Sequence, residues 1–182
     1  DDLSRGLGDV YKRQGDPSSA AFFTALTLIN KNSKLKIKNV GLNPTRIGFY
    51  KILKKHGAKI RFTNIKKENN ELRGDIFVES SKLKPLKASK SFYVNSTDEY
   101  PILFVIAALT KGTSSFKGIA DLKNKESNRI KEMQKVLKQV GIRSVATKNN
   151  LKIFGKGIIN ASDKKIKVPN LGDHRICMST FV

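Results

Sequence analysis

Residues 124–141 read NKESNRIKEMQKVLKQVG, a stretch that joins a charged start to a run of regularly spaced apolar residues. The apolar positions recur at helical spacing, and they are Ile130, Met133, Val136, Leu137 and Val140. This period predicts an amphipathic helix that begins near Ser127. Lys125, Glu126 and Arg129 would then lie at its first turn, where free backbone N–H groups and the helix dipole favour an anion. The stretch indicates either a phosphate or carboxylate site or an ordinary solvated helix start with a Glu–Arg pair.

The same order of patterns occurs twice in the chain. Each copy has an apolar helix, a strand, a second helix and two more strands, at 20–29, 35–40, 47–57, 59–62 and 74–78, and again at 102–109, 115–119, 129–140, 141–145 and 151–154. Asp173 begins a third copy, so the chain carries an internal repeat of about eighty residues. We expect units at about 15–90 and 91–165, with the start of a third at 166–182. Apolar helices surrounded by strands and outer helices are typical of an α/β fold.

Three connecting stretches are predicted from their polar composition. Asn43-Pro44 is expected to cap and open the second helix of the first copy. Residues 64–70 are expected to form a turn, and residues 82–91 a loop.

Composition limits the classes of function. With 182 residues, of which 38% are hydrophobic, the chain has enough apolar residues for the core of one domain. Its net charge of +21 would suit nucleic acid, an anionic membrane or small anionic substrates. Lys residues are spread along the whole chain without a zinc-finger, RNP or KH pattern, so nucleic acid is not favoured. The single Cys177 excludes an internal disulfide, and no apolar run has the length of a membrane span. We expect a soluble, cytoplasmic protein.

Both ends of the sequence look truncated. Residues 4–14, SRGLGDVYKRQ, resemble the translation of a transposase sequencing adaptor, so residues 1–14 are interpreted as an adaptor-derived or cloning artefact. At the other end the chain stops at Phe181-Val182, inside an apolar helical pattern without a C-cap signal.

Five motifs, in order, resemble the 5-enolpyruvylshikimate-3-phosphate (EPSP) synthase family. They are GDPSSAAFF at 15–23, GLNPTR at 41–46, DEYP at 98–101, KESNR at 125–129 and DHRICMS at 173–179. The likeness runs from Gly15 to the end, with Asn128 where the family commonly has Asp and Tyr100 inserted before the proline. It implies an inside-out α/β barrel built from βαβαββ units in each of two domains. This chain would then be most of the C-terminal domain.

The resemblance also implies an activity. The family transfers the enolpyruvyl group of phosphoenolpyruvate to the 5-hydroxyl of shikimate 3-phosphate and releases phosphate, a step toward chorismate and the aromatic amino acids. It implies no metal and no organic cofactor, and a full-length enzyme that is a monomer. The fragment alone is expected to be inactive.

By resemblance, each site residue has a role. Asp98 accepts the proton of the substrate hydroxyl, and Glu126 exchanges a proton at the methylene carbon. Asp98 and Lys125 contact shikimate 3-phosphate. Arg129 and Arg175 clamp phosphoenolpyruvate, because planar guanidinium groups suit carboxylate and phosphate.

Several alternatives stay open at this point. Asp98 could be a simple helix cap, as Asp16 and Asp173 hold equivalent positions. The same fold serves a UDP-N-acetylglucosamine enolpyruvyl transferase and an RNA-terminal-phosphate cyclase, and a third interpretation is a basic nucleic-acid binder. The Lys-Glu-Ser-x-Arg and Asp-His-Arg patterns favour the shikimate enzyme.

Overall fold

The computed structural model describes residues 14–68, 70–159 and 165–182 and confirms the predicted α/β class. The helices are α1 Pro17–Ile29, α2 Gly48–Lys55, α3 Lys90–Tyr93, α4 Tyr100–Ala108, α5 Arg129–Gln139 and α6 His174–Phe181, with short 3-10 helices η1 Thr97–Glu99 and η2 Ala120–Asn124. The strands are β1 Lys34–Gly41, β2 Lys59–Glu68, β3 Glu71–Glu79, β4 Lys87–Ala88, β5 Gly112–Lys117, β6 Arg143–Ala146 and β7 Asn150–Gly155. Residues 1–13, and with them most of the predicted artefact, lie outside the described residues.

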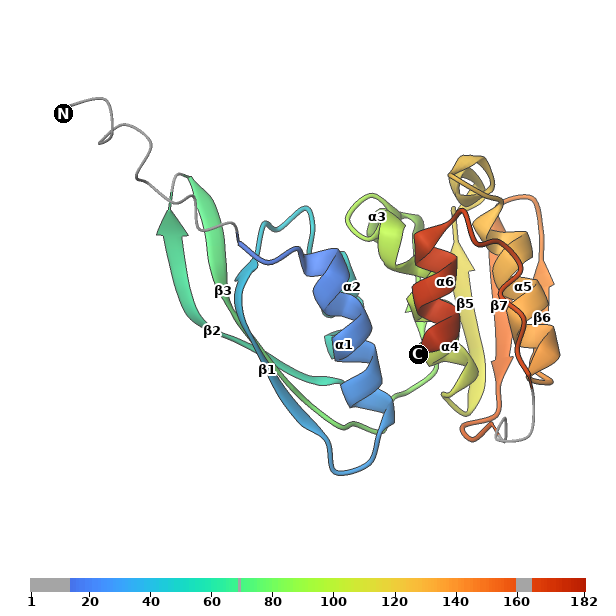
Figure 1. Cartoon of the computed structure of the whole chain (residues 1–182), viewed down its shortest axis with the longest axis horizontal. Coiled ribbons are helices and arrows are strands. Elements are labelled where there is room, and N and C mark those ends of the chain that lie inside the picture. Colours follow the sequence, from blue (N-terminus) through green and yellow to red (C-terminus); the bar gives the residue numbers. More distant parts are fainter. Residues whose placement is uncertain (1–13, 69, 160–164) are drawn as a thin grey trace.

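Two sheets repeat one topology. The first has the order β1-β3-β2 and the second β4-β5-β7-β6. In the first copy β3 lies between β1 and β2, and in the second copy β7 lies in the same way between β5 and β6. These three strands pair antiparallel, whereas β4 joins β5 in parallel. The two sheets lie on either side of the molecule and do not close into a barrel within the described ranges (Figure 1). The predicted boundaries of the units stay predictions.

Apolar helices occupy the space between the sheets. In Figure 1, α1, α4 and α6 lie between the sheet of the first copy and that of the second, and α4 packs against both other helices. The rings of Tyr100, Phe104 and Phe116 meet edge to face, with centroids 4.9–5.9 Å apart. Gly155 permits the close approach of β7 to the end of α4, because a Cβ there would lie 2.2 Å from the carbonyl oxygen of Ala107 in α4 and 2.0 Å from that of Thr110 just beyond it. Among the described residues, no helix combines the length and the apolar character needed to cross a bilayer.

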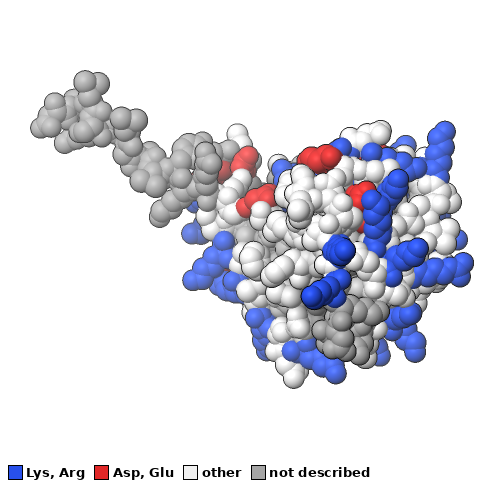
Figure 2. All heavy atoms as spheres, turned by 45° about the vertical axis from the view of Figure 1, so that its right-hand side comes forward, with Lys and Arg blue, Asp and Glu red and all other residues white. Residues whose placement is uncertain are grey.

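Basic side chains are scattered over the surface. Figure 2 shows Lys and Arg at separate positions across the visible face, with the few Asp and Glu side chains toward its upper part. The net charge of +21 is therefore distributed, and this face has no single basic stripe.

Three of the local predictions were wrong. Residues 64–68 are strand rather than turn, because β2 continues to Glu68 and pairs with β3, which begins at Glu71, in a long antiparallel ribbon. Asn43 does not cap α2, whose first residue is Gly48; its Oδ1 instead accepts a hydrogen bond from the Thr45 N–H, 3.0 Å away, in a local turn. The predicted loop at 82–91 contains β4 and the start of α3.

Candidate functional site

Three carboxylates surround the guanidinium group of Arg129. Its Nε donates to Asp173 Oδ2 at 3.0 Å, its Nη1 to Asp98 Oδ1 at 3.1 Å and its Nη2 to Glu126 Oε2 at 2.5 Å. The Arg129 side chain is 1% exposed, and that of Asp173 is fully buried. A buried charge is tolerated only when it is paired, so these carboxylates are what allow Arg129 to lie inside the protein.

Helix α5 begins at Arg129, where the repeat pattern places it, rather than near Ser127. Arg129 is its first residue, and Asn128 caps it by accepting a hydrogen bond on Oδ1 from the Lys131 N–H at 3.0 Å. Lys125 and Glu126 therefore lie in the preceding loop rather than in the first turn. Because Asn and Asp are about equally good caps, the Asn at 128 keeps this function.

Asp98 and Arg175 join the same cluster. Asp98 lies in η1 just before α4, and its side chain is 44% exposed. Its second oxygen, Oδ2, is 3.5 Å from Nη2 of Arg175, a residue in the first turn of α6. The Nε of Arg175 is buried and has no hydrogen-bond partner among the described residues. The structure thus brings Asp98, Glu126, Arg129 and Arg175 together, and the roles expected for them stay predictions.

Lys125 faces a different partner. Its Nζ is 2.8 Å from Asp121 Oδ2, and the same oxygen accepts a hydrogen bond from the Tyr93 hydroxyl at 2.8 Å. The hydrogen bonds from Lys125 and Tyr93 hold the pKa of Asp121 below its ordinary value. Sequence reasoning missed Asp121, although a carboxylate four positions before a lysine is a recognised pairing signal.

Sequence reasoning also missed two buried acids. Asp173 was considered as a helix cap and given no site role. It does cap α6, and it also accepts hydrogen bonds from Arg129 and Ser127; burial opposes its ionisation, but these bonds outweigh burial and lower its pKa. Glu99, in η1 beside Asp98, is 4% exposed. Burial, and then the charge of Asp98, raise the pKa of Glu99 above its ordinary value. No periodicity distinguishes such single carboxylates from surface ones.

The first copy contains a comparable but exposed pair. Asp16 caps α1 by accepting from the Ser19 N–H at 2.9 Å, and its other oxygen lies 3.2 Å from Nη2 of Arg46. The side chains of Asp16 and Arg46 are 44% and 53% exposed. The first copy therefore retains a cap and an arginine without the burial seen around Arg129.

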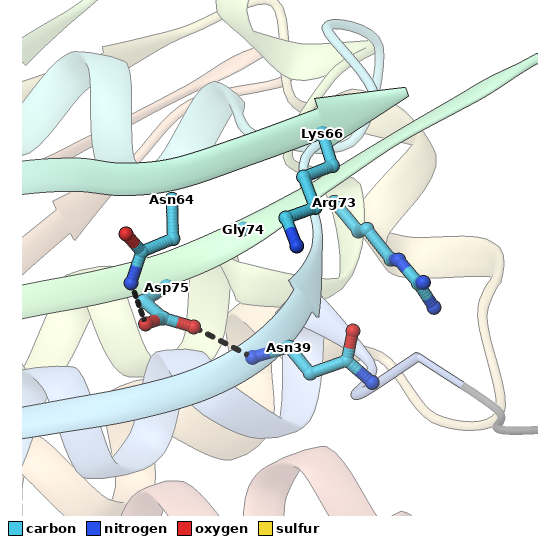
Figure 3. Close-up of a pocket in the computed structure, with 6 residues that line it drawn as sticks. All are labelled: Asn39, Asn64, Lys66, Arg73, Gly74 and Asp75. Atoms are coloured by element: carbon cyan, nitrogen blue, oxygen red, sulfur yellow. Dashed lines mark hydrogen bonds between the residues drawn. The ribbon is translucent and has the colours of Figure 1, made fainter. Parts of the chain in front are cut away.

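A separate hollow lies on the sheet of the first copy. It measures about 460 Å³ and is lined by Asn39, Asn64, Lys66, Arg73, Gly74 and Asp75 (Figure 3). The Asp75 carboxylate accepts from the Asn39 N–H at 3.0 Å and from Asn64 Nδ2 at 2.8 Å. Both asparagines lie where the strand register shifts, and both have positive φ angles. Asp75 therefore fixes a bulge on each strand that flanks β3, and this hollow contains none of the predicted site residues.

The Arg129 cluster combines the types of group that bind anions and exchange protons. Arg129 and Arg175 supply guanidinium donors, and the half-exposed Asp98 and Glu126 supply carboxylates that solvent or a ligand can reach. Across residues 14–68, 70–159 and 165–182, no three His, Cys, Asp or Glu side chains are placed to hold a metal ion.

Comparisons with known proteins identify relatives over nearly the whole chain. The family model of EPSP synthase (3-phosphoshikimate 1-carboxyvinyltransferase) matches residues 5–182. A 3-phosphoshikimate 1-carboxyvinyltransferase of Petrotoga mobilis is 41% identical over 99% of this chain and 41% of its own length, and one of Zymomonas mobilis is 40% identical over 92% and 38%. A solved EPSP synthase of Acinetobacter baumannii superposes with a TM-score of 0.83 at 35% identity, covering 91% of this chain and 38% of its own. The chain thus spans about two fifths of the length of these relatives.

Proposed function

Because the chain belongs to the EPSP synthase family, we propose that it supplies part of a site that transfers an enolpyruvyl group from phosphoenolpyruvate to the 5-hydroxyl of shikimate 3-phosphate. One observation carries this proposal: Asp98, Glu126, Arg129 and Arg175, which come from three separate segments, meet at one point. A paired arginine fork beside two accessible carboxylates suits a substrate that carries a carboxylate and a phosphate.

Phosphoenolpyruvate would bind to Arg129 and Arg175. The Nε–H of Arg175 has no partner in the described part of the chain and can donate to an incoming oxygen. The carboxylate that Arg129 Nη2 now contacts belongs to the half-exposed Glu126, which can move aside without opening the core. An anionic group of the substrate would replace the Glu126 carboxylate on the Arg129 guanidinium. The buried cation would then stay paired throughout.

The two carboxylates would then share the proton transfers. The hydroxyl oxygen adds to the substituted alkene carbon as Asp98 takes its proton, and the methylene carbon gains a proton from Glu126, which enters this step as its carboxylic acid after leaving Arg129. The Glu126 carboxylate then takes a proton back from the resulting methyl group as phosphate leaves, and the alkene is restored. Lys125, held by Asp121 at the edge of the cluster, would neutralise the phosphate of shikimate 3-phosphate.

We further propose a cytoplasmic monomer that acts without a metal or an organic cofactor. Residues 15–182 alone are proposed to be inactive. The chain spans about two fifths of the length of its relatives, so the rest of a full-length protein would be needed to orient the second substrate and to exclude water, both of which contribute to the rate.

The test uses the chain together with any coding sequence that adjoins it in its source DNA, called here the completed protein. Phosphate release is measured with phosphoenolpyruvate and either shikimate 3-phosphate or UDP-N-acetylglucosamine. We expect release only with shikimate 3-phosphate, and a loss of about 10²–10⁴-fold in Asp98→Asn and Glu126→Gln. Asp16→Asn, which alters the exposed cap of the first copy, is the control and should keep full activity.

Other results would contradict the proposal. Release with UDP-N-acetylglucosamine alone would indicate the other transferase. Tight binding to single-stranded or duplex nucleic acid with a steep salt dependence, and no phosphate release, would indicate a nucleic-acid binder.

A further inference from the structure

We propose that Asp173 is a positioning residue that holds Arg129 and Arg175 in the correct relation to bind one anionic group of phosphoenolpyruvate. This inference rests on the proposed function and adds a residue to which the sequence assigned only a capping role. Asp173 does not touch the reacting atoms in this proposal. It acts through the two arginines.

The Asp173 carboxylate is fully buried and bonded on both oxygens. Oδ2 accepts from Arg129 Nε at 3.0 Å and from Ser127 Oγ at 2.8 Å. Oδ1 accepts from the Arg175 backbone N–H at 3.0 Å. Because leaving a buried carboxylate unpaired is costly, these three contacts restrict both the carboxylate and the groups that bond to it.

One consequence is the orientation of Arg129. A guanidinium anchored at Nε presents its opposite edge, the two Nη atoms, in a fixed direction. Here those atoms point to the half-exposed carboxylates of Asp98 and Glu126, which is the side that solvent reaches. Without the anchor, the guanidinium could rotate and offer a single donor in place of a fork.

The other consequence is the placement of Arg175. Asp173 is the N-cap of α6, so the carboxylate that anchors Arg129 also sets where α6 begins. Arg175 lies in the first turn of that helix, with its Nη2 at 3.5 Å from Asp98. One side chain therefore couples the loop before α5 to the start of α6.

In the first copy, Asp16 caps a helix but does not anchor a buried arginine. Asp16 also caps its helix and pairs with an arginine, but both side chains are about half exposed. Water can replace every bond that Asp16 makes, whereas it cannot reach Asp173. Asp16→Asn is therefore a matched control for Asp173→Asn.

The experiment measures both Michaelis constants in the completed protein for wild type, Asp173→Asn, Ser127→Ala and Asp16→Asn. Asn has the same shape as Asp but turns an amide donor toward either Arg129 Nε or the Arg175 N–H, so one bond is lost and the anchor fails. We expect Asp173→Asn to raise KM for phosphoenolpyruvate about tenfold or more, a change of about 1.4 kcal/mol, and KM for shikimate 3-phosphate less than about twofold. Ser127→Ala should have a smaller effect, and Asp16→Asn none.

A second readout needs no substrate. The Arg129 Nε–H should give a slowly exchanging signal in proton–nitrogen NMR spectra, present in wild type and Asp16→Asn and lost in Asp173→Asn. The positioning role would be overturned by a folded Asp173→Asn variant whose KM for phosphoenolpyruvate is unchanged, or whose two Michaelis constants rise equally. If Asp173→Asn fails to fold, wild-type kinetics in Ser127→Ala would overturn it instead. A wild-type protein that does not consume phosphoenolpyruvate would overturn the proposed function, while the NMR comparison would still decide whether Asp173 anchors Arg129.

Discussion

Replacing Arg129 with Lys should destabilise the fold strongly, although the substitution keeps the positive charge. The arginine makes three charge-assisted hydrogen bonds with three separate carboxylates, and one of them, Asp173, is fully buried. A lysine ammonium is a compact point charge and does not reproduce the planar fork. If it follows the half-exposed Asp98 and Glu126 toward solvent, the Asp173 carboxylate is left buried without its cation.

The size of the effect follows from burial. Removing one partner of a buried pair costs about 3–5 kcal/mol, whereas bonds to the half-exposed carboxylates add little because solvent screens them. We expect Arg129→Lys to lower the free energy of unfolding by about 3–5 kcal/mol, a large share of the total of a typical domain.

Urea unfolding followed by circular dichroism measures this change, provided that the slope with denaturant stays constant. Arg46→Lys is the matched control, because Arg46 bonds to a carboxylate but is 53% exposed; its change should stay below about 1 kcal/mol. A loss of less than about 1 kcal/mol in Arg129→Lys would show that the buried pairing does not support the fold.

Three further predictions concern other positions. Burial raises the pKa of Glu99 in the folded protein. Above the ordinary carboxyl pKa, Glu99 ionises in the unfolded chain but keeps its proton in the folded one, so the free energy of unfolding falls as pH rises. Glu99→Gln should therefore raise the melting temperature at pH 8 and leave it unchanged at pH 4, and equal shifts at both values would contradict this. Gly155→Ala would place a Cβ 2.0 Å from the Thr110 carbonyl oxygen and should cost about 3 kcal/mol in urea unfolding, whereas Gly15→Ala, with its nearest atom at 3.5 Å, serves as the tolerated control. Hydrogen bonds from two asparagines and a lysine lower the pKa of Asp75 to about 2. The contribution of Asp75 to the free energy of unfolding is therefore present above about pH 4 and is lost as pH falls toward 2. Asp75→Ala should abolish that part of the acid-induced loss of stability, and an unchanged acid transition would refute the assignment.

Much of the fold could be predicted because the spacing of apolar residues in the sequence indicates which faces of its helices and strands are buried. Helix α5 has one apolar face and α4 is apolar on every side, and the two patterns correctly separated an outer helix from a central one. Residues 64–68 could not be recognised as strand, because this part of the ribbon is exposed on both faces. Its stability comes from backbone pairing with β3, which depends on the partner strand and not on alternation.

The sequence motifs named the candidate site residues, but their contacts could not be predicted. The motifs brought Asp98, Glu126, Arg129 and Arg175 together, yet nothing local indicated that Arg129 would be buried. Its burial depends on Asp173, which lies 44 positions later in the chain. Spacing arguments apply within one helix, whereas this cation is enclosed by carboxylates from separate segments.

The enclosure of Arg129 has a consequence for the order of folding. Its bonds to Asp98 and Asp173 join residues 31 and 44 positions apart, so two long loops must close before they form. Until both carboxylates arrive, the start of α5 cannot dock, because an unpaired guanidinium would lose its hydration without compensation. The apolar ends of α4 and α5 can pack earlier, since they need no such partner. We therefore expect the end of the molecule that holds the Arg129 cluster to become rigid last during folding and to open first during unfolding.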